Sequence, residues 1–227
     1  MEEVIRVSPG FGGFDFSYEK ADVVFFGAPL DVTSSYRSGY RFAPARIREA
    51  SANLETYLPE FDIDVFETLN IGDVGDVVPT PTELQTTGNR ISKLVQKIRE
   101  DGKFPFMLGG EHTVTYFGVK PFEDVFLIHL DAHRDLRDEY LGDRLCHATV
   151  MRRVLDYLPP ENLVQLGIRS CSKEEAEFVK QTPITAYSVG ELRSNLKKVV
   201  EEIKTTVKSK PVYLSIDLDV LDPAFAP

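Results

Sequence analysis

Residues 125–135 read Val-Phe-Leu-Ile-His-Leu-Asp-Ala-His-Arg-Asp, an apolar run that ends in Asp131, His133 and Asp135. The run predicts a strand with both faces buried, because a half-exposed strand would alternate polar and apolar residues. Buried charges are costly unless they are paired or bound to metal. The stretch therefore predicts a strand of a parallel sheet, with a functional site formed by the charged residues at its end.

The same arrangement occurs twice more along the chain. Gly109-Gly110-Glu111-His112 follows the apolar run 104–108, and Asp217-Leu218-Asp219 follows the run 212–216. In open α/β sheets, ligands gather at the carboxyl ends of the strands. Asp-x-Asp or Gly-Gly-Glu-His alone can be only a turn or a cap, and Asp-Ala-His-x-Asp at a strand end is a stronger sign of metal binding. All three clusters at strand ends together indicate one functional site.

Seven apolar segments predict strands, and they are 21–27, 68–71, 104–108, 125–130, 163–168, 184–187 and 211–218. Helices with recognisable ends lie between them. Thr82 is expected to cap a helix that Gly102 ends, and Ser172 with Glu175 fits a capping box. Residues 189–208 carry an amphipathic stripe. This alternation predicts an α/β fold with three layers, α/β/α, and a mostly parallel central sheet.

Composition narrows the class of protein. The chain has 227 residues, of which 42% are apolar and 27% charged, enough for a single domain over 1–227. Mean hydropathy is -0.18, and no apolar run approaches ~20 residues, so no membrane span is expected. The first residues show no secretory signal. Cys146 and Cys171 have no metal-finger or redox spacing, and we expect a cytoplasmic protein.

The net charge is -10, with 36 acidic and 26 basic residues. Solubility alone explains such a balance, but an acidic protein also attracts cationic ligands and repels nucleic acid. Lysine and arginine form no long block, so no nucleic-acid partner is expected.

The ligand types favour a site for two cations. If the strand stays extended, Asp131, His133 and Asp135 face one pocket, and Asp217 with Asp219 repeats the arrangement. Four carboxylates would balance two divalent ions. A carboxylate-rich set suits manganese, while zinc, iron(II) or cobalt remain possible. Two metals ~3.5–4 Å apart can stabilise a tetrahedral intermediate.

Two further histidines have different expected roles. His129 lies inside the strand and is predicted to be a hydrogen-bonded core or supporting residue rather than a ligand. His147 starts a helix after the loop 138–144, and we expect it to transfer protons because imidazole titrates near neutral pH. The alternative for His147 is a solvent-facing residue at a helix start.

These motifs, together with 27–51 and 215–227, closely resemble the ureohydrolase family of arginases and agmatinases, from about residue 21 to the end. The resemblance implies two Mn²⁺ ions per subunit and assigns their ligands. One ion would be bound by His112, Asp131, Asp135 and Asp217. The other would be bound by Asp131, His133, Asp217 and Asp219.

The resemblance also implies the reaction, which is hydrolysis of a guanidinium group to urea and an amine. Asp135 would help to stabilise the tetrahedral intermediate, and His147 would help to protonate the departing amine. Relatives of this kind are usually homo-oligomers, trimers or hexamers.

The loop 135–147 resembles the agmatinase version. Asp138 and Glu139 offer negative charge, which suits a substrate that ends in an amine, although they could simply be solvated, and Arg137 could bind a carboxylate. Agmatine, giving putrescine plus urea in polyamine biosynthesis, is therefore the leading substrate. Aminopropylagmatine is next, and arginine, guanidinobutyrate and formiminoglutamate remain alternatives.

Members of the family continue past the segment that ends at Pro227 into another strand and a final helix. That strand carries a glutamate that binds the guanidinium, and we expect the chain to be truncated before it. A monomer without this strand would expose the edges of its neighbours. The alternatives are a non-catalytic metal-binding relative and a different metallohydrolase, such as a deacetylase.

Overall fold

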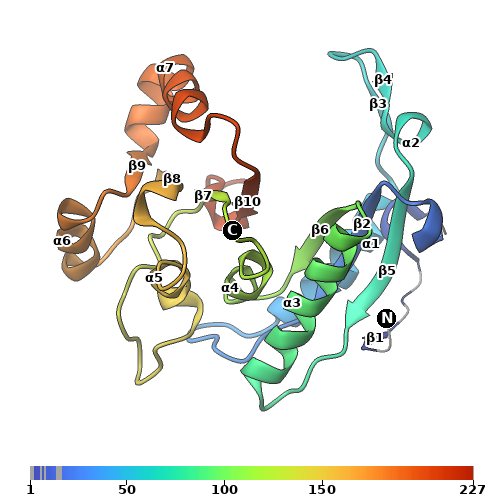
Figure 1. The fold of residues 1–227 in the computed structure, drawn as a ribbon, viewed down its shortest axis with the longest axis horizontal. Coiled ribbons are helices and arrows are strands. Elements are labelled where there is room, and N and C mark those ends of the chain that lie inside the picture. The colour runs from blue at the N-terminus through green and yellow to red at the C-terminus, as the bar shows by residue number, and fades with distance from the viewer. Residues whose placement is uncertain (1–2, 6, 8, 14–16, 227) are drawn as a thin grey trace. The chain divides into compact units, whose positions relative to one another are not determined.

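The computed structural model describes residues 3–5, 7, 9–13 and 17–226. The polypeptide divides into two compact units, Met1–Pro121 and Phe122–Pro227. Figure 1 shows their ribbons, coloured from blue at the N-terminus to red at the C-terminus.

The first unit is built on a four-stranded sheet. β2 (Val23–Ala28) pairs in parallel with β5 (Ile71–Val77) on one side and with β6 (Phe104–Gly109) on the other. β1 (Val4–Ile5) pairs antiparallel with β5, which gives the order β1-β5-β2-β6.

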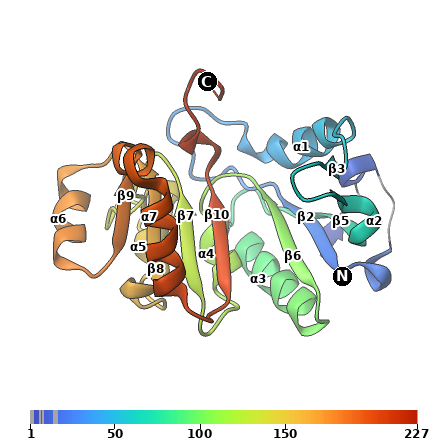
Figure 2. The same ribbon diagram turned by 90° about the horizontal axis from the view of Figure 1, so that it is seen from above.

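Helices cover both faces of this sheet. α1 (Ala43–Ser51) and α3 (Leu84–Glu100) lie on opposite sides of it (Figures 1 and 2). The predicted apolar stripe of α3, from Ile91 to Ile98, is buried. The other elements are η1 (Phe11–Gly13), η2 (Tyr18–Lys20), η3 (Tyr40–Phe42), α2 (Val65–Thr68), α4 (Val114–Val119) and the hairpin of β3 (Tyr57–Leu58) and β4 (Ile63–Asp64).

The second unit has a parallel four-stranded sheet of its own. β7 (Phe126–Leu130) lies between β10 (Val212–Ile216) and β8 (Leu163–Ile168), and β9 (Thr185–Ser188) pairs with β8. The order is β10-β7-β8-β9.

Helices α5 (Val150–Val154) and α7 (Val189–Val207) lie on opposite sides of this second sheet (Figures 1 and 2). The other elements are α6 (Lys173–Gln181), η4 (His147–Thr149), η5 (Pro160–Asn162) and η6 (Leu218–Val220). Ser172 and Glu175 form the predicted capping box at the start of α6. The predicted α/β fold with mostly parallel strands is confirmed.

Several predicted boundaries are wrong. The strand predicted over 211–218 ends at Ile216, and Leu218 already belongs to η6. Residues 68–71 are not a strand, because α2 ends at Thr68 and β5 begins at Ile71. Thr82 was predicted to cap α3 but lies outside the helix. The residue that precedes the helix is Glu83, and its side chain makes no capping hydrogen bond.

A buried ion pair explains why β5 escaped prediction. The strand contains glycine and aspartate, which are poor strand formers. Arg48 of α1 is 1% exposed and donates to Asp73 Oδ2 at 2.7 Å and to Asp76 Oδ1 at 2.6 Å. These contacts allow a polar strand to be buried, and an apolar pattern cannot reveal them.

Each sheet has an exposed apolar strand at one edge. On β10, Val212, Leu214 and Ile216 are 44%, 54% and 53% exposed, and on β6, Phe104 and Phe106 are 60% and 45% exposed. Among the described strands, β10 pairs with β7 alone and β6 pairs with β2 alone. Each of these two strands therefore has one edge without a strand partner among the described residues.

Candidate metal centre

The strand register brings the two aspartate clusters of the second unit together. Ile216 of β10 is paired with Leu130 of β7. Just beyond them, the Asp217 amide donates to Leu130 O at 2.9 Å. The Asp131 amide donates to Leu166 O of β8 at 3.1 Å. Asp131 and Asp217 therefore leave the carboxyl ends of neighbouring strands side by side.

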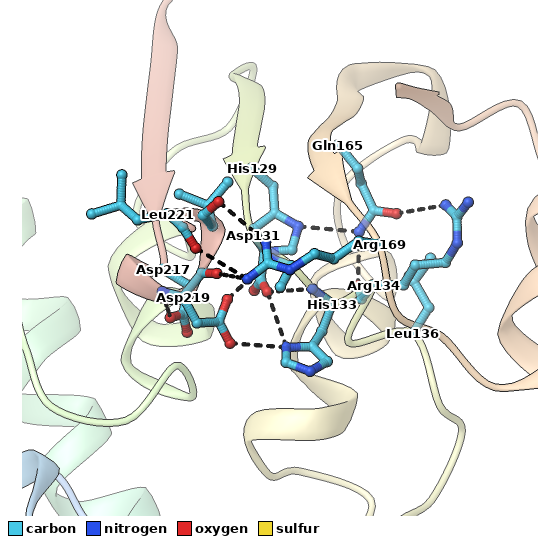
Figure 3. Close-up of polar contacts among 12 residues, drawn as sticks. His129, Asp131, His133, Arg134, Leu136, Gln165, Arg169, Asp217, Asp219 and Leu221 are labelled. Atoms are coloured by element: carbon cyan, nitrogen blue, oxygen red, sulfur yellow. Dashed lines mark hydrogen bonds and ion pairs between the residues drawn. The ribbon is translucent and has the colours of Figure 1, made fainter. Parts of the chain in front are cut away.

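Asp131, His133 and Asp219 form the first group of possible ligands, with ligand atoms within 4.8 Å of one another. His133 Nδ1 lies 2.9 Å from Asp219 Oδ2 and 3.4 Å from Asp131 Oδ1 (Figure 3). Hydrogen bonds to Asp131 first, and then to Asp219, raise the pKa of His133 from 6.5 to about 10. The carboxylates thus favour positive charge at this position.

His129, Asp131 and Asp135 form a second group whose ligand atoms also lie within 4.8 Å of one another. Asp131 is 1% exposed and belongs to both groups. Carboxylate oxygens with a minority of imidazoles suit hard divalent cations such as Mn²⁺. These donor atoms therefore fit a hard divalent cation.

The expectation of an extended backbone through Asp135 is wrong. β7 ends at Leu130, and Asp135 adopts a positive φ of 54°. Asp135 O accepts from Met151 N at 3.0 Å and Arg152 N at 3.2 Å, so the chain turns to meet the start of α5. Aspartate tolerates this left-handed conformation better than most residues.

The aspartates after β10 are also held by a turn and not by a strand. Asp217 flanks the 3-10 helix η6, and its side chain accepts from Asp219 N at 3.1 Å. Asp219 lies within η6, and its Oδ1 accepts from Ala132 N at 3.0 Å. The side chain of Asp219 thereby reaches the segment that carries Asp131 and His133.

Arg169 supports this turn and was not among the predicted residues. Its guanidinium donates to Val220 O and Leu221 O, both at 3.1 Å, and also to Asp219 O (Figure 3). Its amide donates to Ala132 O at 2.9 Å. The sequence could have indicated Arg169, because this residue directly follows β8 at the same end of the sheet as the acidic clusters.

Gly167 allows η6 to approach β8. It has a positive φ of 88°, and a Cβ at this position would lie 2.5 Å from Val220 Cγ2 and 3.3 Å from Asp131 O. A larger residue would push against the turn that carries Asp219 and against the backbone of Asp131.

Glu175 links the capping box of α6 to the segment after Asp135. The carboxylate is buried, and it accepts from Ser172 N at 2.7 Å and from Leu136 N at 3.0 Å. The sequence predicted the first contact, but the second joins residues 39 positions apart and has no local signal.

His129 has the surroundings that the sequence predicted for a core histidine. It is 0% exposed, and its Nε2 lies 2.8 Å from Asp131 Oδ2. Its Nδ1 lies 3.1 Å from Gln165 Nε2. Gln165 is a further residue that the sequence reasoning missed, although a polar residue inside an apolar strand was a visible signal.

His147 begins η4 and belongs to neither group of possible ligands. Its ring makes a T-shaped contact with Tyr140, with centroids 5.8 Å apart. In the preceding loop, Asp138 Oδ1 accepts from Arg153 at 2.7 Å and from Arg144 at 3.3 Å. The bond from Arg153 is the main cause of the lowered pKa of Asp138. Glu139 is exposed.

His112 belongs to the first unit. It is buried in the turn between β6 and α4. Gly110 permits this turn, because a Cβ there would lie 2.1 Å from Leu30 O. The Glu111 carboxylate accepts from Thr33 N and Thr33 Oγ1, both at 2.8 Å, and so holds the loop after β2 against the turn.

None of the helices in the described part of the chain has the length and apolar character needed to cross a bilayer.

A family model described as the Arginase family matches residues 21–227. The chain is 42% identical to an agmatinase of Bacillus anthracis, over 93% of this chain and 72% of that protein. It is 34% identical to the N(1)-aminopropylagmatine ureohydrolase of Thermococcus kodakarensis, over 92% of this chain and 71% of that protein. The crystal structure of agmatine ureohydrolase of Thermoplasma volcanium matches with a TM-score of 0.86 and 38% identity, covering 93% of this chain and 71% of that one.

Proposed function

The chain belongs to the arginase family, and we propose that it hydrolyses agmatine to putrescine and urea with two Mn²⁺ ions. Its similarity to agmatinases makes it a ureohydrolase. The observation that carries the proposal is the place of Asp131, a buried carboxylate common to two groups of possible ligands.

We propose the ligand sets that the family resemblance implies. His112, Asp131, Asp135 and Asp217 would hold one ion. Asp131, His133, Asp217 and Asp219 would hold the other. The short distances among Asp131, His133 and Asp219 support the second set. The assignment of His112 rests on the resemblance alone.

When bound, two divalent cations supply Lewis-acid stabilisation and activate water near neutral pH. The protein residues orient the reactants around them. Asp135 would accept a hydrogen bond from the guanidinium nitrogen as the carbon becomes tetrahedral. His147 would give a proton to the leaving amine, because an imidazole is the commonest general acid in enzymes.

Agmatine is favoured over aminopropylagmatine because the sequence of this chain is more similar to an agmatinase. The sequence identity is 42% to the Bacillus anthracis agmatinase and 34% to the Thermococcus kodakarensis N(1)-aminopropylagmatine ureohydrolase. Asp138 and Glu139 are proposed to attract the distal ammonium. The Asp138 carboxylate already accepts bonds from Arg153 and Arg144, so the exposed Glu139 is the better placed of the two.

The resemblance further predicts a homo-oligomer, a trimer or hexamer, and a cytoplasmic location. We retain both as proposals, together with the absence of a nucleic-acid partner. The acidic net charge of -10 supports the last of these.

The direct test is urea release by the Mn²⁺-loaded chain from agmatine, aminopropylagmatine, arginine and guanidinobutyrate. We expect agmatine to give the highest kcat/KM, and chelation of the metal to abolish release. The chain is assayed with and without a C-terminal segment restored from a related agmatinase. If the extended protein binds two Mn²⁺ ions but releases no urea from any of the four, it is a non-catalytic relative and the proposal is wrong.

A narrower test concerns the proton donor. In His147→Asn, Mn²⁺ content should stay at the wild-type level because His147 belongs to neither group of possible ligands. We expect kcat to fall by about 10²–10⁴-fold, the usual contribution of general acid–base catalysis. An unchanged kcat would remove His147 from the mechanism.

A further inference from the structure

A buried line of polar side chains runs across β7 and β8 behind Asp131. His129 and Gln165 are directly paired in the parallel register, and both are 0% exposed. Arg134 lies at one end of the line and Asp131 at the other (Figure 3). Hydrogen bonds among these side chains are favoured, because an unsatisfied buried donor or acceptor is costly.

The orientation of the Gln165 amide follows from its partners. Gln165 Oε1 lies 3.2 Å from Arg134 Nη1, and a guanidinium can only donate. Gln165 Nε2 lies 2.7 Å from Arg134 O, and a carbonyl can only accept. The NH₂ group of the amide must therefore be the one that faces His129.

This orientation selects one tautomer of His129. Gln165 Nε2 donates to His129 Nδ1 at 3.1 Å, so Nδ1 carries a lone pair and no hydrogen. In a neutral ring the hydrogen then lies on Nε2, which is 2.8 Å from Asp131 Oδ2. His129 thus donates to Asp131.

The two oxygens of Asp131 consequently face different partners. Oδ2 accepts from His129, while Oδ1 accepts from His133 N at 2.6 Å and lies 3.4 Å from His133 Nδ1. Hydrogen bonds of this kind orient metal-binding carboxylates, and their loss typically costs 10–100-fold in metal affinity.

We propose that Gln165 and His129 are positioning residues. Gln165 fixes the neutral Nε2–H tautomer of His129, and His129 holds the Asp131 carboxylate in the orientation that binds cations. The inference rests on the proposed function in treating Asp131 as a metal ligand. It also excludes His129 as a ligand through Nε2, because that nitrogen has no free lone pair when it carries the hydrogen.

The first measurement is the tautomer itself. Two-bond ¹H–¹⁵N spectra of ¹⁵N-histidine protein, metal-free and with Zn²⁺ as a diamagnetic ion, report which ring nitrogen is protonated. The chain has 4 histidines, and the signal that is lost in His129→Phe identifies the ring. We expect Nε2 to be protonated in both states. A hydrogen on Nδ1 of the wild-type ring would overturn the proposal.

The second measurement uses Gln165→Glu, in which an acceptor replaces the donor. We expect His129 to be protonated at Nδ1 as well as at Nε2, giving an imidazolium that competes with Mn²⁺ for the Asp131 carboxylate. Mn²⁺ affinity, measured by calorimetry, should then fall about 10–100-fold. Gln165→Met has a similar volume and no charge, and in this variant His129 should populate both neutral tautomers. It also serves as the test if Gln165→Glu does not fold. The exposed Gln85→Glu is the matched control and should change neither quantity.

Unchanged protonation of His129 in both Gln165 variants would overturn the role of Gln165, and an unchanged Mn²⁺ affinity would overturn the link to Asp131. Urea release from agmatine, measured on the same samples, separates this inference from the proposed function. A wild-type chain with the expected tautomer and Mn²⁺ affinity but no urea release would leave the inference standing and contradict the proposed function.

Discussion

At the scale of single residues, Arg169 fixes the position of Asp219 through backbone contacts. Its guanidinium donates to the carbonyl oxygens of Asp219, Val220 and Leu221. These carbonyls end the 3-10 helix η6, where a cation is favoured electrostatically. A residue that does not belong to either ligand group can therefore control the geometry of one of them.

We predict that Arg169→Met lowers Mn²⁺ affinity at the Asp219 site by about 10–100-fold, because η6 loses its support. Calorimetric titration should show one weakened Mn²⁺ site and one that is nearly unchanged. Arg193→Met, at an exposed position of α7, is the control and should bind as the wild type does. Two sites of wild-type affinity in Arg169→Met would contradict the assignment.

His133 gives the metal-free protein a defined pH dependence. Its pKa is raised from 6.5 to about 10 by Asp131 and Asp219. A raised pKa means that the folded state binds the proton more tightly than the unfolded state does. The stabilisation is therefore complete below pH 6.5 and is lost as the pH rises towards about 10.

The measurement is the urea midpoint of the metal-free chain and of His133→Asn between pH 6 and about 10. We expect the wild type to lose its advantage over His133→Asn as the pH rises through this window. A difference in midpoint that stays constant would show that the carboxylates do not hold a proton on His133.

At the scale of elements, the edge strand β10 combines an open row of backbone groups with exposed apolar side chains. Such an edge is a template for pairing with another chain. The chain of 227 residues should therefore self-associate as its concentration rises.

Leu214→Lys should weaken this self-association, because an edge lysine opposes strand pairing. Sedimentation velocity at several concentrations would measure the change. Leu196→Lys, on α7, is the matched control, since Leu196 is 59% exposed and Leu214 is 54% exposed. Equal effects of the two variants would indicate a general effect of charge and not an effect of the strand edge.

The elements also show what the sequence could and could not predict. Strands such as β7 and β8 were predictable because they are continuous apolar runs between turn residues. β5 was not, since its aspartates are held in the sheet by ion pairs with Arg48, which is distant in sequence. The left-handed Asp135 and the contact of Glu175 with Leu136 also depend on tertiary hydrogen bonds that no local pattern encodes.

At the scale of the whole molecule, the net charge of -10 should affect how a cationic substrate is captured. Agmatine carries two positive charges near neutral pH. A negative protein raises its local concentration and its rate of encounter, and salt screens this effect.

We predict that kcat/KM for agmatine falls as ionic strength rises from about 0.01 M to about 0.15 M, over which the Debye length shrinks from about 30 Å to about 8 Å. Turnover at saturating agmatine should change little, because the bound state is not limited by encounter. The zwitterion guanidinobutyrate, if it is hydrolysed, should show a weaker salt dependence. Equal dependence for both substrates would exclude steering by net charge.

The contact between Glu175 and Leu136 has a consequence for local unfolding. One carboxylate holds the amide of Ser172, which closes the capping box of α6, and the amide of Leu136, next to Asp135. Segments that share a buried partner tend to open as one cooperative unit. Amide hydrogen exchange at Leu136 and in the first turn of α6 should then proceed with a common opening free energy. A cation that orders Asp135 would slow exchange in a helix that contributes none of its proposed ligands.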